Sequence, residues 1–339
     1  MAPLLDIRGL TTVIPTRRGP MTVVEDVSFS LEAGQCLGLV GESGSGKSMV
    51  CRSLLGLVPV PGYSTTGQAL YRNAENSIDL LTLSEQALTR IRGREIAMIV
   101  QDAISALNPV WRIGEQITEA MLSNGTARSR DAARTRALDL MRQVGIPDPE
   151  NRLNAYPHQF SGGMCQRVVI AAALACSPKV IIADEPTTAL DVTVQDQILK
   201  LLIALQRDLG LGLLLVTHDM GVVAQSCQRV AVMYAGQIVE IADTADLFAG
   251  PHHPYSKGLL DCTPRLESAD DSPRLVPIPG MPPNLAELPL GCRFHPRCPL
   301  ATEACRTDPI PLRETAPGRL SRCLRAEDLA AMAPEAVFA

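Results

Sequence analysis

Short apolar runs alternate with longer segments of helical periodicity over the first three quarters of the chain. Three runs, at residues 35–40, 179–183 and 213–217, are only five or six residues long and are almost wholly apolar. Such runs predict strands buried on both faces, as in a parallel sheet. Apolar residues recur at helical spacing from Val194 to Gln206, and an Ala- and Arg-rich segment, residues 128–144, predicts another helix. The alternation of strands and helices predicts an α/β fold.

Proline residues divide the chain unevenly. Eleven of the 26 lie in residues 1–250, and the other fifteen lie in the last 89 residues. Proline lacks a backbone donor and fixes φ, so the C-terminal region cannot support long helices or central strands. We expect an α/β domain over residues 1–260 and a small Pro- and Cys-rich extension over residues 261–339. Residues 272–285 should form an extended connector. The pattern of residues 67–100 is mixed and does not define where helices or strands begin and end.

Composition and charge narrow the class of protein. The 339 residues are 46% hydrophobic and 20% charged, as in a globular protein. The net charge of −5 argues against a nucleic-acid partner, because such binding depends on a basic face. No apolar run approaches the length of a membrane span, and no secretory signal is visible at the N-terminus. We therefore expect a cytosolic chain whose ten cysteines are thiols or metal ligands.

A glycine-rich segment follows the first apolar run. Gly41-Glu-Ser-Gly-Ser-Gly-Lys-Ser48 matches the phosphate-loop pattern G-x-x-x-x-G-K-[ST] and precedes a predicted helix over residues 48–57. Its glycines let backbone N–H groups converge on phosphate oxygens. We expect Lys47 to neutralise the β- and γ-phosphates of ATP and the Ser48 hydroxyl to ligate Mg²⁺. The expected nucleotide contacts here are Gly41, Ser43, Gly44, Ser45, Gly46, Lys47 and Ser48.

Two acidic residues end the second apolar run. Asp184 and Glu185 follow four apolar residues, and α/β sites lie at this end of the strands. We expect Asp184 to hold Mg²⁺ through water and Glu185 to polarise the water that attacks the γ-phosphate.

A second candidate anion site precedes another predicted helix, over residues 165–176. Ser161 is a good N-cap, and Gly162 and Gly163 expose the first amides of that helix. One nucleotide does not need two phosphate sites in one chain. We therefore expect these three residues to cover the γ-phosphate bound to a neighbouring subunit.

These segments together resemble the ATP-binding-cassette ATPases. Ser161-Gly-Gly-Met-Cys-Gln-Arg167 resembles the family signature, and Gln101, Asp191 and His218 follow the family's order within residues 4–250. The resemblance implies a RecA-like core with an antiparallel β subdomain and a helical subdomain. It implies that Gln101 links nucleotide and Mg²⁺ to a transmembrane partner and that Asp191 crosses a dimer interface. It also implies that His218 and Gln101 join Glu185 in catalysis, with His218 contacting the γ-phosphate.

Further segments are similar to the ATPases of dipeptide and oligopeptide importers. They are Ser105-Ala-Leu-Asn-Pro109, Ile113-Gly-Glu-Gln-Ile117, Tyr156-Pro-His-Gln159 and His253-Pro-Tyr-Ser256. This resemblance implies an ATP-hydrolysing subunit at the cytoplasmic face of the inner membrane, peripheral to it. The implied partners are a second, paralogous ATPase subunit, two permease subunits and an extracytoplasmic peptide-binding protein.

Three alternatives stay open. Nickel importers and importers of peptide-like compounds share these segments. A non-transport ATPase of the same family would usually carry tandem cassettes or long coiled-coil insertions, which this chain lacks. A phosphate-loop kinase or GTPase would lack Ser161–Gly163 and His218.

Four cysteines lie in the last 50 residues, at positions 292, 298, 305 and 323, with 5, 6 and 17 residues between them. No C-x-x-C pair occurs, so the usual zinc-knuckle spacing is missing. Four thiolates on one centre would supply folding energy that this core-poor region lacks. Cys292, Cys298, Cys305 and Cys323 suit a [4Fe–4S] cluster or, alternatively, Zn²⁺, and free thiols or a disulfide stay open.

The segment Gly291-Cys-Arg-Phe-His-Pro-Arg-Cys-Pro299 resembles the C-terminal extension of peptide-importer ATPases, some of which carry a [4Fe–4S] cluster. We therefore expect a cluster with a structural or regulatory role. Four other cysteines are expected to be small buried hydrophobes, and three histidines to be loop residues rather than ligands. These are Cys36, Cys51, Cys176 and Cys227, and His252, His253 and His295.

One position departs from the family pattern. These ATPases usually stack adenine on an aromatic residue just after the first strand, and that place falls at or beside Ile14. Base–aromatic stacking contributes about 1–3 kcal/mol. We expect its absence to weaken ATP binding unless the partner chain supplies another group.

Overall fold

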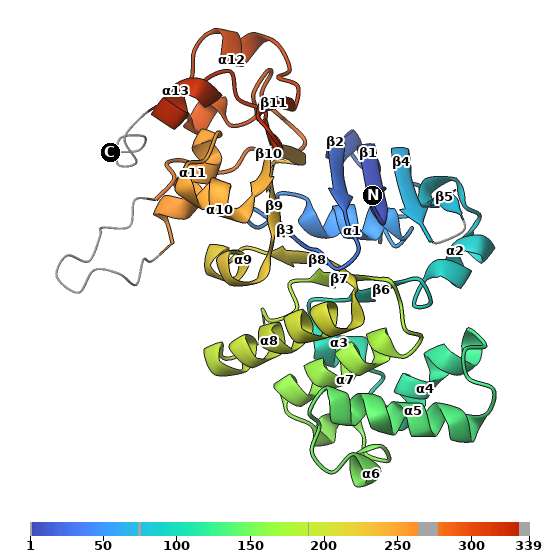
Figure 1. Ribbon diagram of the computed structural model, residues 1–339. Coiled ribbons are helices and arrows are strands. Elements are labelled where there is room, and N and C mark those ends of the chain that lie inside the picture. The colour runs from blue at the N-terminus through green and yellow to red at the C-terminus, as the bar shows by residue number, and fades with distance from the viewer. Residues whose placement is uncertain (1, 74–75, 189, 264–276, 332–339) are drawn as a thin grey trace, which may run out of the picture. The chain divides into compact units, whose positions relative to one another are not determined.

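The computed structural model describes residues 2–73, 76–188, 190–263 and 277–331 (Figure 1). The chain forms two compact units, each built from several segments. The acidic-strand unit comprises Met1–Leu4, Leu31–Cys36 and Thr82–Val216. The phosphate-loop unit comprises Leu5–Ser30, Leu37–Leu81 and Thr217–Ala339.

An antiparallel sheet forms the N-terminal part of the phosphate-loop unit. Its strands lie in the order β2-β1-β4-β5. A Cβ on Gly67 would lie 2.5 Å from the carbonyl oxygen of Gly9, so the close approach of β1 and β4 requires glycine there. The strands are β1 Leu5–Thr16, β2 Gly19–Leu31, β4 Ser64–Arg72 and β5 Ser77–Asp79.

A second group of strands in this unit runs in the order β11-β12-β10-β9-β3. Strand β3 is buried along its whole length, pairs in parallel with β9, and leads into helix α1, Lys47–Leu54. Strands β11 and β12 come from the C-terminal extension, and β12 pairs with β10, so the extension continues the sheet. The bounds are β3 Cys36–Val40, β9 Arg229–Tyr234, β10 Gln237–Asp243, β11 Arg313–Ala316 and β12 Arg319–Ser321.

The helices of the C-terminal part are short. His252 and His253 lie in a loop as expected, but both are buried, and the His253 side chain accepts a hydrogen bond at the start of α11. Burial lowers the pKa of His253 to about 3, so its imidazole is neutral. The helices are α9 Met220–Ser226, α10 Thr244–Ala249, α11 Pro254–Asp261, η3 His295–Arg297, α12 Ala304–Thr307 and α13 Ala326–Ala331.

The acidic-strand unit combines a parallel sheet with a group of helices. Strand β7 pairs in parallel with β6 on one side and with β8 on the other. The strands are β6 Ile96–Ile99, β7 Val180–Asp184 and β8 Gly212–Thr217. The helices are α2 Glu85–Ile91, α3 Ala103–Ala106, α4 Ile113–Ser123, α5 Arg130–Gln143, α6 Pro149–Arg152, η2 Pro157–Gln159, α7 Gly162–Leu174 and α8 Val192–Leu209.

The structure confirms the α/β class and each strand and helix predicted from periodicity, with shifts of a few residues at their ends. The mixed segment 67–100 contains most of β4, then β5, the short helix η1 Leu80–Thr82, α2 and β6. Of the predicted connector, residues 272–276 lie outside the described residues, and residues 277–285 form no helix or strand. A domain boundary at residue 260 stays a prediction. No helix among the described residues is long and apolar enough to cross a membrane.

Candidate nucleotide-binding site

The phosphate loop lies between β3 and α1, and two of its glycines are required by close packing. A Cβ on Gly41 would lie 2.1 Å from the carbonyl oxygen of Met233, and a Cβ on Gly46 would lie 2.8 Å from that of Val23. Both glycines have positive φ, at 153° and 103°. The loop is therefore pressed against β9 and β2, which leaves its backbone little freedom to move.

Lys47 is buried at the start of α1 and points back across the loop. Its Nζ donates hydrogen bonds to the carbonyl oxygens of Gly41, at 2.8 Å, and Glu42, at 3.0 Å. Ser43 and Gly44 at the tip are exposed, Ser45 is buried, and Ser48 is half-buried in the first turn of α1. The arrangement places a cation and the first amides of a helix at one loop, which is suited to phosphate groups.

The acidic end of β7 is built by an unusual backbone turn. Asp184 is the last residue of the strand and is almost fully buried. Glu185 follows with φ of 45°, a left-handed conformation that non-glycine residues seldom adopt. Its N–H donates to the carbonyl oxygen of Val216 in β8. Strain of this kind is often found where a side chain must be aimed for function.

The Glu185 carboxylate accepts two hydrogen bonds at Oε2. Gln101 Nε2 donates at 3.2 Å, and Thr188 Oγ1 donates at 2.8 Å. The structure thus brings together two residues that the sequence singled out separately. The sequence motifs do not single out Thr188 as a partner of Glu185; the signal that could have found it is a hydroxyl three residues after the glutamate. These contacts hold the carboxylate in one orientation, as a base acting on a water molecule requires.

Ser161 caps helix α7 as predicted, and Asp191 caps α8. Ser161 Oγ accepts from the N–H of Met164 at 3.4 Å, and Asp191 Oδ1 accepts from the N–H of Val194 at 3.0 Å. Both side chains are exposed. A Cβ on Gly163 would lie 2.6 Å from Cγ1 of Val194, so this glycine is also needed for the packing of α7 on α8. Gly162 has ordinary space around it.

His218 is exposed and lies between β8 and the N-cap residue of α9, Asp219. It belongs to the phosphate-loop unit, as do Lys47 and Ser48, whereas Asp184 and Glu185 belong to the acidic-strand unit. A shared Mg²⁺ site of Ser48, Asp184 and Gln101, and the contact of His218 with a γ-phosphate, stay predictions. The predicted place of the missing aromatic residue, Ile14, is half-buried in β1.

The four cysteines of the extension line one apolar cavity, together with Phe294, Leu300 and Ile310. Burial, with a smaller contribution from the neighbouring cysteines, raises the pKa of Cys298 to about 11 and of Cys323 to about 12. Among the described residues, however, no three His, Cys, Asp or Glu side chains are grouped closely enough to hold a metal ion. The arrangement of the described residues therefore supports neither the predicted cluster nor the zinc alternative.

The cysteines predicted to be small hydrophobes are buried, as expected: Cys36, Cys51, Cys176 and Cys227. Cys165 is also buried, and burial raises the pKa of its thiol. Cys262 is exposed.

Comparisons with known families give two matches. Residues 24–188 match the family model described as ABC transporter. Residues 239–305 match the model described as oligopeptide/dipeptide transporter, C-terminal region.

Full-length relatives are similar along almost the whole chain. The oligopeptide transport ATP-binding protein OppD of Escherichia coli is 46% identical over 322 residues, 95% of this chain and 93% of that protein. The dipeptide transport ATP-binding protein DppD of Escherichia coli is 44% identical over 320 residues, 94% of this chain and 96% of that protein.

A solved structure is also similar in fold. It is a dimeric ATP-binding cassette in a post-hydrolysis state, bound to ADP and phosphate. The two chains are 27% identical, with a TM-score of 0.62, and the match covers 71% of this chain and 98% of that one.

Proposed function

Because this chain belongs to the ABC transporter family, in its branch of peptide transport ATP-binding proteins, we propose that it is the ATP-hydrolysing subunit of a dipeptide or oligopeptide importer. The observation that carries the proposal is the joint match of a cassette and a transporter-type C-terminal region in one chain. Nickel or a peptide-like compound is the alternative cargo, because importers of those substrates share the same sequence segments.

The chemistry of hydrolysis is assigned to the two loops described above. The phosphate loop binds the triphosphate of ATP, and Lys47 neutralises part of its charge. Glu185, oriented by Gln101 and Thr188, accepts a proton from the attacking water. Ser48, Asp184 and Gln101 would hold Mg²⁺, which would offset the charge of the phosphate oxygens.

A second ATPase subunit, a paralogue of this one, completes the site in this proposal. The exposed Ser161 and the half-buried Gly162 and Gly163 at the N-terminus of α7 face a phosphate bound by the partner, and Asp191 contacts the partner across the interface. The dimeric state of the similar cassette with ADP and phosphate supports this arrangement. ATP binding closes the dimer, and hydrolysis opens it again.

An apolar groove in the acidic-strand unit is the proposed contact with the permease subunits. Met98, Val100, Leu107, Trp111 and Val169 are among its lining residues. One of these residues, Val100, directly follows β6 and precedes Gln101 in the sequence. A short amphipathic helix from a permease loop would fit such a groove by burying its apolar face.

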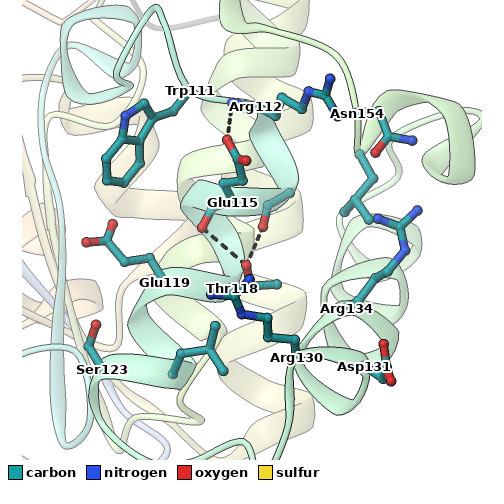
Figure 2. Close-up of a pocket in the computed structure, with 13 residues that line it drawn as sticks. Trp111, Arg112, Glu115, Thr118, Glu119, Ser123, Arg130, Asp131, Arg134 and Asn154 are labelled. Carbon is teal, nitrogen blue, oxygen red and sulfur yellow. Dashed lines mark hydrogen bonds between the residues drawn. The ribbon is translucent and has the colours of Figure 1, made fainter.

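Trp111 joins this groove to a neighbouring polar hollow on α4 and α5 (Figure 2). Figure 2 shows Glu119 and Arg130 among the charged side chains around that hollow, which gives the apolar contact a polar rim. Val110, the residue before Trp111, is 74% exposed and adds apolar surface beside the groove. The subunit would lie at the cytoplasmic face of the inner membrane on two permease subunits, which receive peptide from an extracytoplasmic binding protein.

We also propose that Cys292, Cys298, Cys305 and Cys323 hold a [4Fe–4S] cluster. What supports the proposal is that all four thiols line one cavity and that four cysteines are the usual ligand number of such a cluster. The cluster would supply folding energy through its iron–thiolate bonds. The ATP site needs no redox group, so its role would be structural or regulatory.

Replacing Glu185 tests the ATPase and transport assignments together. Glu185→Gln keeps a side chain that can bond to Gln101 but removes the base, so ATP turnover should fall at least about 100-fold while MgATP still binds. Uptake of a labelled tripeptide into proteoliposomes holding the assembled complex should fall in parallel. Glu150→Gln, at an exposed glutamate on α6, is the control. Hydrolysis at the wild-type rate by Glu185→Gln contradicts the assigned role, and ATP-driven uptake of nickel but not peptide by the wild type contradicts the cargo.

Replacing Ser161 tests the composite site. Ser161→Arg in this subunit should prevent nucleotide trapping by vanadate at the partner's phosphate loop and leave ATP binding at its own Lys47 intact. The matched control is Ser129→Arg, at another exposed serine N-cap, on α5. Photolabelling with an azido-ATP reports which subunit has lost its site. Loss of labelling confined to the mutated subunit itself would rule out the composite arrangement.

The groove prediction uses the exposed tryptophan. Trp111→Ser should reduce co-purification with the permease subunits at least about tenfold, because buried aromatic anchors dominate interface energies. ATP binding by the free subunit should not change. Leu209→Ser, an exposed apolar residue at the end of α8, is the control. Unchanged assembly of Trp111→Ser would show that the permease contact lies elsewhere.

The cluster prediction is tested by metal analysis. Protein purified without oxygen should be brown, absorb near roughly 400 nm and contain on the order of four irons per chain. Cys298→Ser should lose most of the iron and make the extension sensitive to protease, with the ATPase core still folded. Cys262→Ser, at the exposed cysteine, should keep its iron. Colourless protein with one equivalent of zinc would exclude the cluster.

A further inference from the structure

The second residue of the phosphate loop, Glu42, is held from outside by the C-terminal extension. Arg297 binds its carboxylate through both guanidinium ends, Nη1 to Oε2 at 2.8 Å and Nη2 to Oε1 at 3.0 Å. The two residues are 255 positions apart, and the Arg297 side chain is only 5% exposed. The Glu42 side chain is 28% exposed, so the pair is part-buried. Its bidentate geometry fixes the orientation of the carboxylate as well as its charge.

The backbone of Glu42 is fixed as well. Its N–H donates to Oη of Tyr255 at 2.7 Å, and its carbonyl oxygen accepts from Lys47 Nζ. Tyr255 is fully buried on α11. Hydrogen bonds thus hold the side chain, the N–H and the carbonyl oxygen of Glu42. Two of these three groups are held by residues outside the segment 24–188 that matches the ABC transporter model.

Aromatic rings hold Arg297 in place. Its guanidinium lies 5.8 Å from the ring centres of both Tyr234 and Phe294, and Nη1 donates to Tyr234 Oη at 3.3 Å. The rings of Tyr234 and Tyr255 are 4.6 Å apart. Because these groups are buried and in mutual contact, Arg297 has little freedom to turn away from Glu42.

A neighbouring arginine reaches the same loop by another route. Arg293 donates to the carbonyl oxygen of Ala235 and pairs with Glu25. The next residue, Gly236, donates its N–H to the carbonyl oxygen of Ser45 in the phosphate loop at 2.8 Å. The extension therefore supports the loop directly at Glu42 and indirectly at Ser45, through Ala235 and Gly236.

We propose that Arg297, with Tyr255, is a positioning residue for ATP binding. An unpaired carboxylate at the second position of the loop would repel the triphosphate, and Arg297 neutralises it. At the same time the clamp keeps the loop in its anion-binding shape before ATP arrives, which lowers the cost of ordering it on binding. The inference uses ATP binding only, so it stands apart from the proposed cargo and from the proposed cluster.

The test measures MgATP affinity of the full chain in the non-hydrolysing Glu185→Gln background. Arg297→Gln should raise the ATP dissociation constant about tenfold. Adding Glu42→Gln should restore the affinity to within about threefold of the parent, because the repelling charge has gone. Arg306→Gln, an exposed arginine in the same extension, is the matched control and should change nothing.

Three further measurements separate positioning from simple folding support. Arg297→Lys keeps the charge but not the fork, and should weaken ATP binding less than Arg297→Gln. Tyr255→Phe keeps the packing but loses the acceptor for the Glu42 N–H, and should weaken it several-fold, which keeps the test valid if Arg297→Gln fails to fold. In the hydrolysing chain, Arg297→Gln should raise KM for ATP and change kcat less than twofold. Unchanged ATP affinity in both Tyr255→Phe and Arg297→Lys, or no rescue by Glu42→Gln, would overturn the proposal.

Discussion

The need to gather backbone N–H groups around an anion at the end of a buried strand governs much of this protein. A loop that binds through its backbone must be held by something other than its own side chains. Here neighbouring strands press so closely on Gly41 and Gly46 that no Cβ fits at either position. Lys47 turns back across the loop and supplies the positive charge. The loop is thus shaped by contact with its surroundings.

That requirement explains why the C-terminal part contributes to a site 213 to 255 positions away along the chain. Glu42 in the loop carries a charge of the wrong sign for phosphate, and Arg297 cancels it while Tyr255 fixes its backbone. Arg297 and Tyr234 are in turn packed with Phe294. Phe294 and Arg297 belong to the short segment 292–298, which begins and ends with cysteines that line the apolar cavity of the extension. Stability of the extension and the shape of the phosphate loop are therefore physically connected.

The acidic-strand unit solves a different problem, which is to aim a carboxylate. Glu185 adopts a left-handed φ and receives two hydrogen bonds, from Gln101 and Thr188. In the same unit, Ser161 and Asp191 each accept a hydrogen bond from a backbone N–H at the start of their own helix. Both side chains nevertheless stay exposed to solvent. Side chains that are already held in place by their own helix and are still exposed suit a surface that a partner subunit covers on assembly.

The sequence by itself determined the features that depend on a few adjacent residues. The buried strands, the phosphate loop, the acidic strand end and the Ser161 cap all follow from local patterns, because backbone geometry and hydrogen-bond needs are set over one turn or one strand. It did not reveal the role of Glu42, because the phosphate-loop pattern allows any residue at that position. Nor did it reveal the contact of Gln101 with Glu185, which are 84 positions apart. The sequence also suggested that the four cysteines of the extension share one site, and they do line one cavity, but only the tertiary structure brought Arg297 to Glu42. Such contacts depend on how distant segments pack, and no local spacing encodes that packing.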